Sequence, residues 1–505
     1  MFIIKTNGKC KSLASSRYLR VMKRELKPQF VELIGEMSKQ RFGACFKGLV
    51  EALESTDPVV AIRPNLSKSV VAVGSSKPVE WGLGHERRVD GERPRFTLDP
   101  AFHQGLYYVQ DPSSMVIASV VRRLIGGCDR PLVYIDACAA PGGKTTAAID
   151  ALPQGSLVIA NEFDRRRAET LKENVAKWGV PGVVVAQGDT AALRGLGPVA
   201  DIVAVDAPCS GEGMMRKDAD ARAQWSPELV ARCAALQREI LENAWQALRP
   251  GGYLIYSTCT FNPHENDQNV VFMIEELGAE AVDFNVQGAF AMVVPVKSLL
   301  ADGGGCPIVL RFIPSMLEGE GLFMTVVRKP AGAADAPSRR SKPSARKQPK
   351  AAVPVPAEVK RWLSGDFSFK TDGQSVVAVP ASWAATVDFI STKLNVIAAG
   401  VEVATAKGRD YQPTQQLAMS TALSPGAFAR CEVGYQNAIA YLRGEAVDLS
   451  AADSEPPRGF ILLTYRGRPL GFVKNIGNRA NNLYPKPWTI KTTHVDAEPP
   501  APLVD

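Results

Sequence analysis

Between residues 132 and 260, short apolar runs alternate with segments in which apolar residues recur every three or four positions. Continuous apolar runs of about four to eight residues are typical of buried strands, whereas the wider spacing is typical of helices that bury one face. The alternation predicts an α/β fold with a parallel sheet and right-handed crossover helices. The predicted strands are 132–138, 157–162, 183–186, 201–205 and 253–256.

The longest predicted helix begins after Ser226, a residue that suits an N-cap, and we expect it to end at the Arg-Pro-Gly-Gly of residues 249–252. Cys233 lies on its apolar stripe, which favours a core role for this thiol. A second helix is predicted over residues 111–124, with Asp111 as its cap, leading into the sheet.

The flanking segments have different patterns. Apolar residues at helical spacing, from Phe30 and again from Phe42 to Leu53, predict a small helical region before the sheet. Beyond the sheet, a basic Pro/Ala/Ser-rich stretch is typical of a disordered linker, and the segment after it mixes short strands and a helix. Residues 1–21 are basic and aperiodic, so we expect disorder there, with Met22 as an alternative start. The predicted divisions are 1–21, 22–110, 111–329, 330–354 and 355–505.

The composition is that of an ordinary soluble protein, with 46% hydrophobic residues in 505 and a net charge of +7. No apolar run is long enough for a membrane span, and the N-terminus lacks the pattern of a signal peptide. We therefore expect a cytoplasmic protein. The nine cysteines are scattered without metal-ligand spacing, which argues against a disulfide scaffold and a metal site. The positive charge suits an anionic partner without requiring one.

Two of the predicted strands run into cysteine-containing loops. Residues 206–211 read Asp-Ala-Pro-Cys-Ser-Gly, and residues 256–261 read Tyr-Ser-Thr-Cys-Thr-Phe. Side chains at the carboxyl ends of parallel strands face the ligand crevice of an open α/β sheet. We therefore expect Cys209 and Cys259 to face one pocket.

A third strand leads into a glycine turn at residues 138–145, Cys-Ala-Ala-Pro-Gly-Gly-Lys-Thr. Such a turn lets the backbone approach a ligand, and the free amides of the following helix favour polar or anionic ligand atoms. It lacks the glycine spacing of a dinucleotide site, and Cys138 replaces the first glycine of a phosphate loop. Glu162 ends the next strand, where a carboxylate can accept both ribose hydroxyls of a nucleoside.

Taken together, these motifs resemble the Sun family of S-adenosylmethionine-dependent RNA (cytosine-5) methyltransferases. The resemblance rests on 136–145, 206–213 and 257–260, and it extends to 96–100 and 107–115. It covers residues 28–329 and resumes near the C-terminus, where residues 478–485 resemble the PUA-like region of the RsmF type. That type modifies 16S ribosomal RNA.

The resemblance implies a Rossmann-like methyltransferase sheet between RNA-binding flanks, a PUA-like α+β domain after residue 355, and 16S ribosomal RNA or the small subunit as partner. It implies Cys259 as the nucleophile and Cys209 as the residue that assists its release. Lys144 and Asp206 are further catalytic candidates, and Asp189 is expected to contact adenine. The expected S-adenosylmethionine site comprises Cys138, Ala139, Ala140, Pro141, Gly142, Gly143, Lys144, Glu162, Asp189 and Asp206. We expect a monomer.

The sequence departs from the family at Arg63-Pro64-Asn65-Leu66, where Arg-x-Asn-Pro is usual. Two interpretations of Arg63 remain open, a phosphate contact and an exposed structural arginine.

The proposed chemistry explains why cysteines are needed. Carbon 5 of cytosine is a poor nucleophile until a group adds at carbon 6, and a thiolate is suited to that addition. Asp206 is a candidate to protonate or hydrogen-bond N3 of the ring, which favours addition. A base inside a helix must also be flipped out, so RNA-binding flanks are expected.

The motifs differ from those of two other classes of methyltransferase. A DNA cytosine-5 methyltransferase has glutamine after its Pro-Cys, whereas Ser210 follows Cys209 here, and an exocyclic-amine enzyme needs Pro-Pro-aromatic in place of Ala207-Pro208-Cys209. Transfer RNA as the substrate, and a non-catalytic ribosome-assembly factor, remain the alternatives.

Overall fold

A computed structural model gives the structure of the protein. It describes residues 24–39, 43–73, 76–289, 291–293, 307–332, 354–408, 410–449, 456–477, 479–492 and 494–505. The predicted extension 1–21 and most of the predicted linker 330–354 lie outside the described residues.

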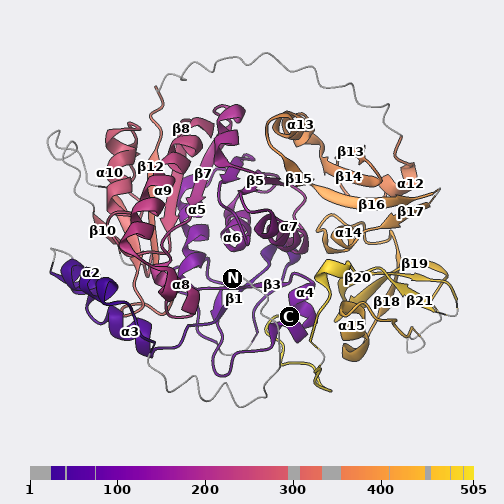
Figure 1. Ribbon diagram of the computed structural model, residues 1–505. Coiled ribbons are helices and arrows are strands. Elements are labelled where there is room, and N and C mark those ends of the chain that lie inside the picture. The colour runs from indigo at the N-terminus through magenta and orange to yellow at the C-terminus, as the bar shows by residue number, and fades with distance from the viewer. Residues whose placement is uncertain are drawn as a thin grey trace.

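A mixed β-sheet forms the centre of the molecule, in the order β10-β11-β12-β8-β7-β4-β5-β6-β15 (Figure 1). Its five middle strands are parallel, and the strands on either side of them are antiparallel. The parallel strands are β4 (Val133–Asp136), β5 (Leu157–Glu162), β6 (Val183–Gln187), β7 (Ala200–Asp206) and β8 (Leu248–Thr258). The outer strands are β10 (Ala291–Val293), β11 (Ile308–Phe312), β12 (Leu322–Arg328) and β15 (Val396–Ala399), and β9 (Glu280–Ala281) pairs with β12. The predicted parallel sheet is confirmed.

Successive residues of the parallel strands point to opposite faces of this sheet, and each face is covered by helices. In β4, Ile135 packs in the hydrophobic cluster that contains α9 and α10, and Tyr134 packs in the cluster that contains α5, α6 and α7. Burial on both faces explains the continuous apolar runs of these strands. The covering helices are α5 (Val116–Ile125), α6 (Gly143–Ala151), α7 (Arg165–Trp178), α9 (Pro227–Ala247) and α10 (Asp267–Glu275).

Two predicted helix boundaries shift. Ser226 caps α9 as predicted, by accepting a hydrogen bond from the Leu229 amide, but the helix ends at Ala247 because Leu248 already pairs with β7. The helix expected over 111–124 begins as a 3-10 turn, Ser113–Met115, and continues as α5. Asp111 caps this turn by accepting from the Ser114 amide at 3.1 Å. Cys233 is buried, as expected.

The N-terminal region contains short helices and a small antiparallel sheet. Phe42, where the predicted apolar pattern begins, lies outside the described residues; the rest of the pattern, to Leu53, forms two segments rather than one, because Gly48 adopts a left-handed conformation between them. The ring of Phe30 meets the ring of Trp225 edge-on at 5.3 Å, which packs α2 against the segment just before α9. The elements of this region are α2 (Pro28–Ser38), η1 (Gly43–Phe46), α3 (Leu49–Ser55), β1 (Ala61–Pro64), β2 (Arg87–Arg88), α4 (Pro100–His103) and β3 (Tyr107–Gln110). The helix α8 (Ala219–Gln224) lies between β7 and β8 in the chain.

The C-terminal region contains two four-stranded sheets, β13-β14-β16-β17 and β18-β19-β20-β21. The predicted strands at 459–465 and 469–474 are confirmed as a hairpin that turns at Arg466 and Gly467. The strands are β13 (Phe367–Asp372), β14 (Ser375–Pro380), β16 (Val401–Lys407), β17 (Asp410–Pro413), β18 (Ala429–Glu432), β19 (Gly459–Tyr465), β20 (Arg468–Asn475) and β21 (Ala480–Asn482). The helices are α12 (Ala357–Lys360), α13 (Ala384–Lys393), α14 (Gln415–Met419) and α15 (Tyr435–Leu442).

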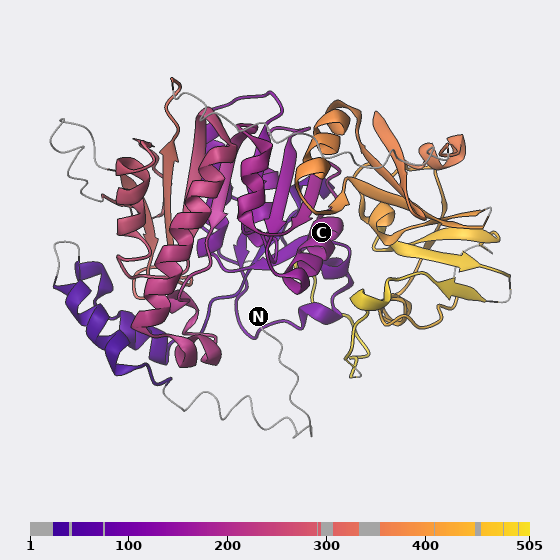
Figure 2. The same cartoon turned by 45° about the horizontal axis from the view of Figure 1, so that its top comes forward.

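One strand of this C-terminal region belongs to the central sheet. Strand β15 pairs with β6, and α13 places Val387 and Ile390 in the same core cluster as the central strands (Figure 2). The Trp383 indole donates a hydrogen bond to the Gly155 carbonyl at 2.6 Å. The segment after residue 355 is therefore joined to the central sheet by pairing and by packing. Among the described residues, no helix is long and apolar enough to cross a membrane.

Candidate active site

The two cysteine loops meet at the carboxyl ends of neighbouring parallel strands. Asp206 of β7 is in register with Ser257 of β8, and each chain continues into its cysteine. The Sγ atoms of Cys209 and Cys259 are 3.1 Å apart, and both side chains are partly exposed. A disulfide bond is about 2.05 Å long, so these are two free thiols in contact. The two cysteines therefore lie together at one edge of the sheet.

Contact with the second thiol affects the protonation of Cys209. The hydrogen bond to the Cys259 sulfur, followed by burial, raises the pKa of Cys209 well above its ordinary value. Cys209 therefore keeps its proton at neutral pH and can donate it to the neighbouring sulfur.

Asp206 and Lys144 form an ion pair beside the thiols. Lys144 Nζ lies 2.9 Å from Asp206 Oδ2, and the Ser257 hydroxyl donates to Asp206 Oδ1 at 2.8 Å. Burial acts to lower the pKa of Lys144, but the charge and hydrogen bond of Asp206 outweigh it, so the pKa of Lys144 is raised. The lysine stays protonated and fixes the orientation of the carboxylate.

The glycine turn lies at the N-terminus of α6. Gly142 has φ +106°, a conformation that suits glycine, and a Cβ there would lie 3.1 Å from Leu171 Cδ1. Glu162 supports the turn: its carboxylate accepts hydrogen bonds from the amides of Ala140 (3.3 Å) and Asp164 (3.0 Å). Burial raises the pKa of Cys138 well above its ordinary value, so this thiol stays neutral. The remaining predicted residues of the turn, Ala139, Ala140, Pro141, Gly143 and Lys144, are contiguous with it.

The neighbouring strands β5 and β6 end beside this turn, at Glu162 and Gln187. Phe163 follows Glu162 and is 69% exposed, and its carbonyl accepts a hydrogen bond from the Gln187 side chain at 2.8 Å. Asp189 is exposed and caps the 3-10 helix η5 (Thr190–Leu196) by accepting from the Ala191 amide. The side chain of Asn395, just before β15, donates to both the backbone and the side-chain oxygen of Gln187. Sequence reasoning missed Phe163, Gln187 and Asn395.

A buried acid, Asp136, lies at the end of β4. The Thr145 hydroxyl donates to its Oδ2 at 2.7 Å, and its Oδ1 has no hydrogen-bond partner among the described residues. Burial raises the pKa of Asp136 to about 7. In the sequence, Asp136 is visible only as a charged residue at the end of an apolar strand, within the motif at 136–145 and without a predicted role.

Both interpretations of Arg63 as a surface residue are wrong. Its side chain is fully buried, forms an ion pair with Asp150 and donates to the Thr146 hydroxyl. Its guanidinium lies 4.4 Å from the centre of the Trp178 ring. Arg63 therefore fastens β1 to α6, the helix that starts at the glycine turn, and it is not available to a phosphate group.

Two buried glutamates connect the cysteine loops. Glu212 of the Cys209 loop accepts the amides of Phe261 and Asn262, and Glu265, after the Cys259 loop, accepts the amide and hydroxyl of Ser210. Neither glutamate was predicted to have a role at the site. The sequence could have indicated them only through their position, because each lies a few residues after a cysteine.

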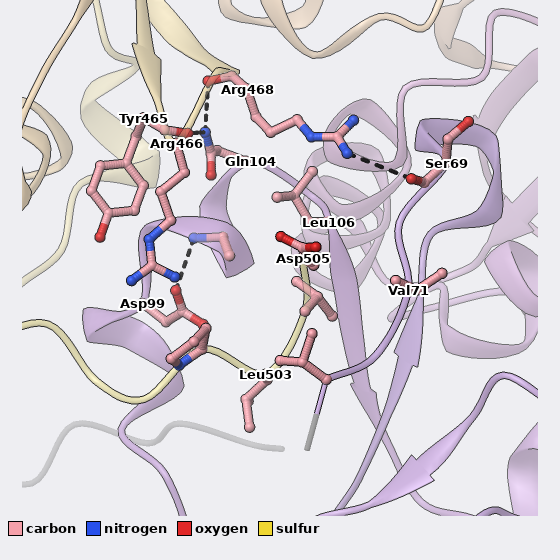
Figure 3. Close-up of a pocket in the computed structure, with 14 residues that line it drawn as sticks. Ser69, Val71, Asp99, Gln104, Leu106, Tyr465, Arg466, Arg468, Leu503 and Asp505 are labelled. Carbon is pink, nitrogen blue, oxygen red and sulfur yellow. Dashed lines mark hydrogen bonds between the residues drawn. The ribbon is translucent and has the colours of Figure 1, made fainter.

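A cavity of about 340 Å³ lies away from this site, between the N-terminal region, the β19–β20 turn and the chain end (Figure 3). The Gln104 side chain donates to the carbonyls of Tyr465 and Arg468, and the Asp505 amide donates to the Val71 carbonyl. None of the predicted site residues lines it.

Comparison with known proteins identifies two segments. Residues 130–328 match the family described as 16S rRNA methyltransferase RsmB/F, and residues 428–490 match the methyltransferase RsmF PUA domain. The fold is thus a Rossmann-like methyltransferase sheet with a C-terminal PUA domain.

Relatives align over most of the chain. The ribosomal RNA small subunit methyltransferase F of Citrobacter koseri is 31% identical over 458 residues, covering 88% of this chain and 91% of the relative. The protein of that name from an Escherichia coli O139:H28 strain is 31% identical, covering 76% and 78%. A methyltransferase homologue from Pyrococcus horikoshii of known structure is 22% identical with a TM-score of 0.47, covering 60% of this chain and 100% of its own. On the length and identity of the first alignment, this chain belongs to the RsmB/F family of 16S rRNA methyltransferases.

Proposed function

We propose that this protein transfers a methyl group from S-adenosylmethionine to carbon 5 of a cytosine in 16S ribosomal RNA, through a covalent adduct between Cys259 and carbon 6. The observation that carries the proposal is the pair of free thiols 3.1 Å apart beside the Lys144–Asp206 ion pair. The names of the relatives support the substrate. Ribosomal RNA as substrate also supports the cytoplasm as the place of action.

The crevice beside the thiols suits S-adenosylmethionine. Its glycine turn leaves room for close approach, the first amides of α6 favour a carboxylate, and Glu162 and Asp189 provide acceptors for ribose and adenine donors. When bound, this cofactor supplies a methyl group on a positively charged sulfur. The donors and acceptors of the described residues here thus suit the charged and polar groups of this cofactor.

The protein's own residues would act in two stages. In the first, the Cys259 thiolate bonds to carbon 6, which moves electron density to carbon 5 and lets that carbon take the methyl group, leaving S-adenosylhomocysteine. Asp206, oriented by Lys144 and Ser257, would hydrogen-bond the ring near N3 and favour this addition.

In the second stage, the proton on carbon 5 leaves to a base and its electron pair forms the carbon 5–carbon 6 double bond. The bond from carbon 6 to sulfur breaks, and Cys259 departs with the bonding electrons. Cys209 is placed to donate its proton to the departing sulfur, because the two Sγ atoms are 3.1 Å apart and its raised pKa keeps the Cys209 thiol protonated. The net products are 5-methylcytosine, S-adenosylhomocysteine and a proton.

Single cysteine variants test this division of roles. Cys259→Ala should abolish methylation and form no adduct, whereas Cys209→Ala should transfer the methyl group and then stall as a covalent complex. With ribosomal RNA from cells that lack the gene, that complex should run as a slow, ribonuclease-sensitive band on a denaturing gel. The double variant, as control, should lose the band. A band from Cys259→Ala and none from Cys209→Ala would reverse the assignment.

Bisulfite sequencing of total RNA, with and without the gene, tests the substrate. A cytosine in 16S ribosomal RNA should be methylated in cells that carry the gene and unmethylated in cells that lack it. If only transfer RNA loses methylation in cells that lack the gene, transfer RNA replaces 16S ribosomal RNA as the proposed substrate. If no RNA loses methylation, and calorimetry shows no binding of S-adenosylmethionine, the result would favour a non-catalytic assembly factor.

A further inference from the structure

Each cysteine loop carries a glutamate that binds the other loop. Glu212 follows Cys209, and its Oε2 accepts the backbone amides of Phe261 (2.7 Å) and Asn262 (3.0 Å), just beyond Cys259. Glu265 lies beyond Cys259, and it accepts the amide of Ser210 (3.0 Å), next to Cys209. The two loops are therefore cross-linked by hydrogen bonds in both directions.

Both carboxylates are saturated with donors. The second oxygen of Glu212 accepts from the indole of Trp225 (3.0 Å) and from the Asn262 side chain (2.9 Å). Glu265 also accepts from the Ser210 hydroxyl and from the side chains of Gln237 and Asn262, both at 2.7 Å. Both residues have no exposed surface.

The geometry requires acceptors here, because amides and an indole can only donate. Replacing either glutamate by glutamine turns one carboxylate oxygen into an amide NH2 group, which donates. At Glu265, one oxygen accepts from the Ser210 amide and the other accepts from the Asn262 side chain, so either orientation of a glutamine places its NH2 group against a donor. At Glu212, Asn262 donates to both oxygens, so either orientation disturbs Asn262.

The two glutamates thus hold different cysteines. Ser210 is bonded to Cys209 in the chain, and the Gln237 side chain that donates to Glu265 also donates to the Pro208 carbonyl at 2.9 Å. Phe261 and Asn262 are the second and third residues after Cys259, and the Cys259 carbonyl accepts from the Gly213 amide at 2.8 Å. A Cβ at Gly213 would lie 3.0 Å from that carbonyl, so the loops are already at their closest approach.

We propose that Glu265 and Glu212 are positioning residues for different steps of the reaction: Glu265 holds Cys209 for release of the adduct, and Glu212 holds Cys259 for attack. The proposal rests on the proposed function of the two thiols. A displacement of about 1 Å at a reacting group can cost about 10²-fold in rate, so each variant should slow its own step by that order.

The test measures adduct and turnover in the same variants, with ribosomal RNA from cells that lack the gene and S-adenosylmethionine. Glu265→Gln should accumulate the ribonuclease-sensitive band, as expected of Cys209→Ala, while turnover falls about 10²-fold. Glu212→Gln should lose turnover to a similar extent without a band. If the glutamine variants fail to fold, Ser210→Ala and Trp225→Phe serve in their place, because each removes one donor and leaves the glutamate. Ser210→Ala should then behave as Glu265→Gln does, and Trp225→Phe as Glu212→Gln does, with smaller effects.

Glu86→Gln is the matched control, since Glu86 is also fully buried and accepts the amides of Leu83, Gly84 and His85 far from the thiols. It should change stability without producing a band or a step-specific loss of turnover. Equal behaviour of Glu265→Gln and Glu212→Gln, or a band from Glu212→Gln alone, would overturn the proposal. If Cys209→Ala itself forms no band, the proposed function of the thiols fails first, and the two failures are thereby distinguished.

Discussion

Arg63→Ala should destabilise the protein strongly, because it leaves a carboxylate buried without its cation. Neither Arg63 nor Asp150 has an exposed side chain, and removing one member of a buried pair typically costs about 3–5 kcal/mol. Loss of the contact with the Trp178 ring adds about 1–2 kcal/mol. Since such contributions are not additive, we expect a loss of about 4 kcal/mol in the free energy of unfolding.

The loss should grow with pH. Burial raises the pKa of Asp150 from 3.8 to about 6, and Arg63 counteracts that rise. Without Arg63, the folded-state pKa of Asp150 rises further, so the variant continues to lose stability above pH 6, where wild-type Asp150 is already ionised. The destabilisation should therefore be larger at pH 8 than at pH 5.

Urea denaturation at both pH values, followed by tryptophan fluorescence, measures this loss. Arg95→Ala is the matched control: Arg95 pairs with Asp496, both side chains are 53% exposed, and the expected cost is at most about 1 kcal/mol. The double variant Arg63→Ala/Asp150→Asn should recover part of the stability. A loss below about 1 kcal/mol together with weakened RNA binding would refute the buried anchor and restore Arg63 as a phosphate contact.

Two further predictions concern the proposed cofactor site. Asn395→Ala removes the two side-chain hydrogen bonds that hold Gln187, and with it the Phe163 carbonyl, so calorimetry should show the Kd for S-adenosylmethionine rising about three- to tenfold, which corresponds to about 1 kcal/mol in all; an unchanged Kd, as expected for Asn437→Ala in the PUA domain, would contradict it. Burial raises the pKa of Asp136 from 3.8 to about 7, so folding loses stability as pH rises through that window. Asp136→Asn should therefore gain about 3 kcal/mol of stability relative to wild type between pH 5 and pH 8, since about two pH units of the window lie above pH 5; a difference independent of pH in urea denaturation would rule out a protonated Asp136.

The sequence by itself determined the sheet and the meeting of the two cysteines. Strands buried on both faces must be apolar throughout, so each parallel strand was visible as a continuous run. Each strand's end was marked by its motif, and parallel strands end at one edge of the sheet. Cys209 and Cys259 were therefore expected together, although fifty residues separate them.

Only the tertiary structure decided how the parts are held together. Strand β15 joins the edge of β6 from far along the chain, Arg63 is buried against α6, and two glutamates cross between the cysteine loops. Each of these depends on a partner distant in sequence, and a charged or polar residue has the same local pattern on a surface as in a buried network. Periodicity reports which face of an element is buried, whereas the partner of a buried polar group is set by the packing of the whole chain.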